Sequence, residues 1–202
     1  MKTIGIMGGT FNPIHMGHLM LAECAREEFS LDEVWFIPTG YSYMKEGGLK
    51  DPLSADRLKM TKIAVEGNPY FRCLDIEVLR EGNTYTYETL EELEQLYPDT
   101  KRYFILGADC LYEIEGWKEP ERIFAACDII AAVREEFDVS QMQDKIEELC
   151  AKYGARILFL PFGEVAISST DIRERVRLGK SIRYMVPDAV MCYIEEKGFY
   201  RE

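Results

Sequence analysis

The segment that most constrains the fold of this chain is 8–18, Gly-Gly-Thr-Phe-Asn-Pro-Ile-His-Met-Gly-His. An apolar run, 3–7, precedes it, and apolar residues recur at near-helical spacing through 19–29 after it. The segment is therefore predicted to connect a short buried strand to an amphipathic helix. Gly8 and Gly9 carry no Cβ, so backbone N–H groups in this turn can approach an anion closely.

The same turn has the features of a phosphate site. Asn12-Pro13 is typical of a helix start, where N–H groups and the positive end of the helix dipole attract anions. His15 and His18 are three residues apart and should project from nearly the same side of the first helical turn. A Gly-Gly-Thr turn is also a common plain connection, and neither the dinucleotide fingerprint nor the P-loop pattern can be written through 5–18.

The rest of the chain alternates between predicted strands and helices. Strands are expected at 33–38, 70–79, 103–106, 128–133 and 156–160, and helices at 54–66, about 86–97, 139–153, 171–178 and 187–197. In the 54–66 helix the apolar positions are Leu58, Ile63, Ala64 and Val65. This alternation predicts one domain, 1–202, with an α/β fold: a doubly wound, mainly parallel sheet of Rossmann-like topology and a C-terminal helical segment.

Composition excludes several classes of function. With 36 acidic and 24 basic residues, the formal net charge is −12, which argues against a nucleic-acid partner. No apolar run reaches the ~18 residues of a membrane span, so a cytoplasmic protein without a membrane partner is expected. The six cysteines are scattered without a C-x-x-C pair, which predicts free, mainly buried thiols and no zinc site. Assembly into a homo-oligomer is left open.

Three further features are candidates for ligand contacts. Asp109 follows a predicted strand directly, where α/β proteins concentrate such contacts, although a helix N-cap is an equally good interpretation. Trp117 lies in a polar turn and is either a lid packed on the core or a stacking platform. The long connection 39–53 contains Lys45 and Lys50, which without other information are interpreted as solvated loop lysines.

The stretch 168–173, Ser-Ser-Thr-Asp-Ile-Arg, is a second candidate anion site. Asp171 and Glu174 have capping-box spacing, so a helix is predicted to begin there. One interpretation is a well-capped surface helix with a basic face. The other is that hydroxyls and N–H groups at the helix start, with Arg173 one turn in, bind a phosphate. Two anion sites in an acidic chain suit a polyphosphate ligand.

The two segments together resemble the signatures of the nucleotidyltransferase superfamily. Segment 8–18 is similar to the GTFxPxHxGH motif, and 168–173 is similar to the S-[ST]-x-x-[IL]-R motif that binds ATP phosphates. With Asn-Thr-Tyr-Thr-Tyr-Glu-Thr-Leu at 83–90, Leu-Gly-Ala-Asp at 106–109 and Trp117, the chain resembles the bacterial nicotinate-mononucleotide adenylyltransferases over essentially its full length.

The resemblance implies a set of site residues. His15, His18 and Arg173 would be catalytic. ATP would be bound by Gly8, Gly9, Thr10, Phe11, His15, His18, Gly107, Asp109, Arg134, Ser168, Ser169, Ile172 and Arg173. The mononucleotide would be bound by Thr10, Lys45, Thr84, Tyr85, Thr86, Asp109, Trp117 and Lys118. The family usually has Pro-His-Lys in the loop after the second strand, whereas this chain has Tyr43-Met44-Lys45, so only the lysine is kept.

The implied reaction transfers the adenylyl group of ATP to the 5′-phosphate of nicotinate mononucleotide, giving nicotinate adenine dinucleotide and pyrophosphate. A Mg²⁺ ion would bridge the ATP phosphates, with no dedicated metal ligands on the protein. His15, His18, Arg173 and Lys45 would neutralise developing charge. Two alternatives differ in the residues they require: a sister transferase for phosphopantetheine or an alcohol phosphate would not use Thr86 and Trp117, and a catalytically silent nucleotide-binding module would lose the histidines.

Overall fold

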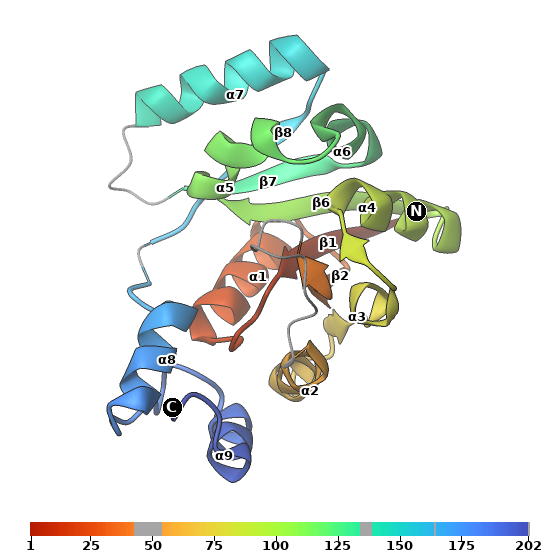
Figure 1. Ribbon diagram of the computed structural model, residues 1–202. Helices are drawn as coiled ribbons and strands as arrows, with labels where there is room; N and C mark the ends of the chain where they lie inside the picture. The colour runs from red at the N-terminus through yellow and green to blue at the C-terminus, as the bar shows by residue number, and fades with distance from the viewer. Residues whose placement is uncertain (43–53, 134–138, 164, 202) are drawn as a thin grey trace.

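The computed structural model describes residues 1–42, 54–133, 139–163 and 165–201. They form a six-stranded, wholly parallel sheet in the order β4-β2-β1-β6-β7-β8 (Figure 1). The strands are β1 (Lys2–Gly9), β2 (Glu33–Pro38), β4 (Phe71–Cys73), β6 (Thr100–Gly107), β7 (Asp128–Val133) and β8 (Ile157–Pro161). Numbered along the chain, this is the order 3-2-1-4-5-6 of a Rossmann fold. The predicted doubly wound sheet is confirmed.

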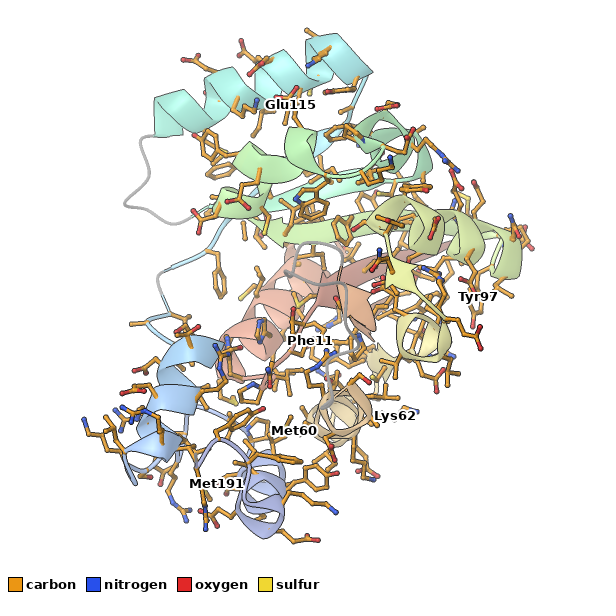
Figure 2. All side chains as sticks on the ribbon, in the orientation of Figure 1. Phe11, Met60, Lys62, Tyr97, Glu115 and Met191 are labelled. Carbon is orange, nitrogen blue, oxygen red and sulfur yellow. The ribbon has the colours of Figure 1, made fainter. Side chains whose placement is uncertain are left out.

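Helices cover both faces of the sheet. On one face lie α1 (Met16–Glu28), α2 (Ser54–Val65), α8 (Ser169–Arg177) and α9 (Asp188–Lys197). On the other face lie α4 (Thr86–Leu96), α5 (Ala108–Glu113), the 3-10 turn Ile114–Gly116, α6 (Pro120–Ala126) and α7 (Val139–Tyr153). Figure 1 shows α8 and α9 together, beside the start of α1, as the expected C-terminal helical segment. Figure 2 labels Met60 of α2 and Met191 of α9, which belong to the same core cluster.

The central strands are apolar at successive positions because both of their faces are buried. In β6, Tyr103 and Ile105 belong to the core on the α1 side, while Phe104 and Leu106 belong to the core on the α4 side. This alternation explains why the sequence shows continuous apolar runs rather than a polar and an apolar face. A second, two-stranded sheet pairs β3 (Tyr41–Ser42) with β5 (Asn83–Thr84).

The predicted strand 70–79 is wrong beyond its first few residues. Within 70–79 the strand is limited to β4 (Phe71–Cys73), and the helix α3 (Ile76–Leu79) follows it. β4 lies at the sheet edge and pairs only with β2, and this pairing ends at Cys73 opposite Phe36. One more backbone bond, from Leu74 N–H to the Phe36 carbonyl at 2.9 Å, precedes the turn into α3. The alternation of apolar and polar residues in 74–79 therefore does not correspond to β-sheet pairing.

Two other expectations need correction. The buried face of α2 is Ser54, Arg57, Met60, Thr61 and Val65, so it includes a charged residue and differs from the predicted apolar stripe. All six cysteines lie in the described part of the chain and are free thiols, but only Cys127 is buried, and Cys24 and Cys192 are exposed. Within the described residues, none of the helices has the length and apolar character needed to cross a membrane.

Candidate active site

The turn after β1 brings the two histidines into direct contact. Helix α1 begins at Met16 with His15 as its N-cap, three residues later than the predicted start at Asn12-Pro13. The imidazole rings of His15 and His18 lie on the same side of the turn, as predicted, and they stack with centroids 3.7 Å apart. The backbone N–H of His15 donates to Nδ1 of His18 at 3.2 Å. Because Nδ1 accepts this bond, the proton of the neutral His18 ring lies on Nε2, which is left to donate to a ligand.

Burial keeps both histidines neutral in the free protein. It lowers the pKa of His15 from 6.5 to about 4. It also lowers the pKa of His18 to about 3, with repulsion from His15 as a second cause. At pH 7 these histidines therefore bring no positive charge to the free site. They offer N–H donors instead, and the buried Nδ1 of His15 has no hydrogen-bond partner among the described residues.

This neutrality predicts a loss of stability in acid. Histidines of the unfolded chain bind protons below about pH 6.5, whereas the folded state resists protonation down to pH 4 or 3, so stability is complete above pH 6.5 and falls as the pH is lowered. At pH 5 we expect a cost of about 2 kcal/mol for each histidine. Urea unfolding at pH 7 and pH 5 should show a smaller decrease for His18→Asn than for the wild type. An equal decrease in both proteins would contradict the assignment of neutral rings.

The start of α8 packs directly against the same turn. The Ser169 hydroxyl donates to the Pro13 carbonyl at 2.8 Å, and the Arg173 guanidinium donates to the Asn12 carbonyl at 2.9 Å. The N-cap is Ser168, whose hydroxyl accepts from the Asp171 N–H at 3.0 Å. The helix thus begins at Ser169, two residues before the start predicted from the Asp171 and Glu174 spacing. The two candidate anion sites form one continuous surface.

A small cavity lies beside this surface, where β6 and β7 end. Its volume is about 110 Å³. It is lined by Leu21, Gly107, Ala108, Asp109, Ala132, Phe162 and Val165. Gly107 is the N-cap of α5, and Asp109 is an exposed residue of its first turn, so the N-cap interpretation of Asp109 is wrong. β1 and β6 are neighbours at the point where the strand order reverses, which is where open α/β sheets bind ligands.

The predicted ring-binding residues border the core on the α4 side. Tyr85 is the N-cap of α4 and Thr86 its first residue. Trp117 is half-buried and packs edge-to-face against Phe104, with ring centroids 6.2 Å apart. Phe104 in turn lies next to Gly8, because a Cβ on Gly8 would be 3.4 Å from that ring. Trp117 is therefore partly a core residue and leaves part of its indole accessible.

Some predicted side chains are not available to a ligand. Phe11 is 2% exposed and Ile172 is fully buried, so both could bind ATP only through the main chain. Figure 2 shows Phe11 in the interior, where its ring contacts His18 edge-to-face at 5.0 Å. Lys118 is exposed. Lys45 and Arg134 lie outside the described residues.

Sequence reasoning missed two residues that organise this surface. The Tyr200 hydroxyl donates to Oδ1 of Asn12 at 2.6 Å, which links the far end of the chain to the first turn. Arg57 is 1% exposed and donates to the Thr10 carbonyl at 2.5 Å. The only sequence signal for Arg57 was its helical spacing, which places it on the buried face of α2. Nothing in the sequence pointed to Tyr200.

The chain is similar to known proteins over its whole length. The model of the cytidylyltransferase-like family matches residues 6–175. A Lachnoclostridium phytofermentans protein named “Probable nicotinate-nucleotide adenylyltransferase” is 46% identical over 201 residues, which cover 99% of this chain and 100% of the relative. A Desulfitobacterium hafniense protein of the same name is 44% identical over 200 residues, which cover 99% of this chain and 96% of the relative.

A solved structure has the same fold. The Plasmodium falciparum nicotinic acid mononucleotide adenylyltransferase, complexed with NaAD, superposes with a TM-score of 0.77 at 22% identity, covering 99% of this chain and 98% of that one. The sequence relatives, the family match and the shared fold agree with one another. The chain therefore belongs to the nicotinate-nucleotide adenylyltransferase family.

Proposed function

We propose that this protein transfers the adenylyl group of ATP to the 5′-phosphate of nicotinate mononucleotide, releasing pyrophosphate and forming nicotinate adenine dinucleotide for NAD biosynthesis. The observation that carries the proposal is the meeting of two anion-binding segments at the reversal point of the sheet. Ser169 and Arg173 contact the turn that holds the histidine pair. The names of the sequence relatives support the choice of substrates.

The chemistry needs alignment and charge stabilisation more than proton transfer. A phosphate monoester is already largely ionised at pH 7, so its oxygen can attack the α-phosphorus of ATP without a base. The new P–O bond forms as the bond to pyrophosphate breaks. The ring N–H groups of His15 and His18 would donate hydrogen bonds to the phosphates, and the positive end of the α1 dipole would attract them. The Arg173 guanidinium would stabilise the negative charge of the leaving pyrophosphate. His15 and His18 are neutral in the free protein at pH 7, so they enter the site as hydrogen-bond donors.

Mg²⁺ enters this reaction as part of the substrate Mg·ATP. In the described ranges, no three histidine, cysteine or acidic side chains gather into a metal site. Mg²⁺ usually keeps several waters and binds substrate phosphates, so the proposal requires no dedicated set of protein ligands. The ion lowers the charge repulsion between ATP and the mononucleotide phosphate.

Each nucleotide has a proposed location. Adenosine would lie over the mouth of the small cavity beside Gly107 and Asp109, and the ATP phosphates would lie along Gly8, Gly9, Thr10 and the start of α8. The nicotinate ring would lie between the start of α4 and Trp117, with Thr84, Tyr85 and Lys118 nearby. Lys45 and Arg134 keep their proposed contacts to the mononucleotide and ATP from the family resemblance alone. The six free thiols support a cytoplasmic location.

One assay tests the proposal against its closest alternatives. The purified protein is incubated with Mg·ATP and, separately, nicotinate mononucleotide, nicotinamide mononucleotide or phosphopantetheine, and pyrophosphate release is followed. We expect the fastest release with nicotinate mononucleotide. Release with phosphopantetheine alone would identify a sister transferase, and no release with any acceptor would identify a silent nucleotide-binding protein.

A further inference from the structure

Arg57 of α2 binds three backbone carbonyls beneath the candidate site. Its guanidinium donates to the carbonyls of Thr10 at 2.5 Å, Thr39 at 2.6 Å and Gly40 at 3.4 Å. Thr10 follows β1, while Thr39 and Gly40 follow β2, so one buried side chain joins the loops at the carboxyl ends of two neighbouring strands. A charged group that is 1% exposed is costly to bury, and hydrogen bonds to carbonyls offset that cost.

These bonds also orient the peptide groups of the site. In a trans peptide the C=O and the next N–H point in opposite directions. The Thr10 carbonyl points toward Arg57, so the N–H of Phe11 in the same peptide group points away from the guanidinium. The Thr39 carbonyl also points toward Arg57, so the N–H of Gly40 points away from it as well. The N–H groups thus face away from the guanidinium at the edge of the sheet where phosphates are proposed to bind. A second bond, from the Thr39 N–H to the Gly9 carbonyl at 2.9 Å, holds the two loops together.

Gly40 also packs against the part of the protein that is proposed to bind the mononucleotide. A Cβ on Gly40 would lie 2.0 Å from the Glu77 carbonyl oxygen, so the backbones of Gly40 and Glu77 touch and only glycine fits. The buried Glu77 carboxyl accepts a hydrogen bond from the Thr89 hydroxyl at 2.8 Å and another from the Thr84 hydroxyl. Burial raises the pKa of Glu77, while the Thr89 hydrogen bond and the charges of Arg80 and Arg57 lower it. Thr84 is itself one of the residues proposed to bind the mononucleotide.

We propose that Arg57 is a positioning residue that fixes the ATP turn at Thr10 to the mononucleotide side of the site through Thr39, Gly40 and Glu77. It touches neither nucleotide. Its role is to hold the two reactants at the distance and angle that in-line attack requires. This inference rests on the proposed adenylyl transfer, since it assigns to Arg57 the relative placement of the two substrates.

Arg102 provides a matched control at the opposite end of the sheet. It is also buried, with 8% exposure, and its guanidinium donates to the carbonyls of Thr100 at 3.2 Å and Ala126 at 3.4 Å and to Glu94 at 2.8 Å. It lies near the amino end of β6, away from the loops that form the site. Replacing either arginine leaves buried carbonyls without a donor, so both replacements should destabilise the fold. Only one of them disturbs the site.

The test compares Arg57→Met with Arg102→Met. Both should lower the urea midpoint of unfolding. At a temperature where both remain folded by circular dichroism, Arg57→Met should lower kcat/KM for ATP and for nicotinate mononucleotide by about 10²-fold, the effect expected when reacting groups shift by about 1 Å. Arg102→Met should keep kcat/KM within about threefold of wild type, since groups far from the site couple weakly to it. If both variants lose kcat/KM to the same extent, Arg57 only stabilises the fold, and the proposal is overturned.

Two other variants decide the question if Arg57→Met does not fold. Arg57→Lys keeps the charge but loses the planar fork, so it should recover part of the lost kcat/KM. Gly40→Ala leaves Arg57 in place and displaces the backbone from Glu77, so it should also lower kcat/KM for both substrates. Wild-type kinetics in both variants would overturn the proposal. If the wild type itself releases no pyrophosphate, the proposed function has failed, and that result is visible before any variant is compared.

Discussion

Replacing His18 by Asn should lower kcat by about 10²- to 10³-fold while changing the free energy of unfolding little. Removal of one preorganised donor from a site of developing charge has an effect of this size. The Asn carboxamide occupies the position of Nδ1, so it can still accept the His15 N–H bond that caps α1, but nothing replaces Nε2. The measurement is single-turnover formation of the dinucleotide at saturating substrates, with urea unfolding alongside.

His18→Gln is the matched control, because its carboxamide lies close to the position of Nε2 and its NH₂ group can donate there. If the histidine acts as a neutral donor, as its low pKa indicates, Gln should retain much more activity than Asn. If the ring must be positively charged during the reaction, both variants should be equally poor. Near wild-type turnover in the Asn variant would remove His18 from the mechanism.

Nicotinate mononucleotide should be preferred over nicotinamide mononucleotide by about 10²-fold or more in kcat/KM. The two rings differ in a carboxylate and a carboxamide, so the site must distinguish them with groups that only donate. Main-chain N–H groups at the start of α4 and just after Trp117 are the proposed donors, and Thr86 is the first residue of that helix. Donors that face a carboxylate make charge-assisted bonds, whereas donors that face an NH₂ group stay unpaired.

The variants of this site separate main-chain from side-chain recognition. Thr86→Ala should keep most of the preference, because the N–H groups remain. Trp117→Ala should weaken the binding of both mononucleotides, because the half-buried indole is proposed to pack against either ring. Comparison of kcat/KM for the two acceptors at saturating Mg·ATP is the measurement. A ratio near one, or a preference for the amide, would refute the substrate assignment and leave adenylyl transfer standing.

The sequence was sufficient wherever a local pattern decides the structure. The apolar run Glu33–Pro38 and the amphipathic segment Val139–Tyr153 are β2 and α7 with the predicted bounds. Strand 70–79 failed because pairing, which is a long-range property, ends at Cys73 and leaves the rest of the alternation without a partner strand.

The candidate site shows the same division. The spacing of His15 and His18 was enough to predict that they project from the same side of the turn, and their rings stack there. Residue type alone could not show that the Phe11 side chain lies in the core, so that only its main chain is left for a ligand. Arg57 could not be identified either, because its carbonyl partners are 17, 18 and 47 residues away along the chain. A motif names residues but does not say which of their atoms face the substrate.

The bonds from α8 and Tyr200 to the first turn have a consequence for synthesis on the ribosome. Ser169, Arg173 and Tyr200 contact Pro13 and Asn12 across 156, 161 and 188 residues. The ribosome therefore makes this turn more than 150 residues before the side chains that contact it. Domains begin to fold from the N-terminal side during translation, so the sheet can form around an incomplete site. A nascent chain therefore completes these contacts only once residue 200 has left the exit tunnel, and chains stalled before that point should not carry out the proposed adenylyl transfer.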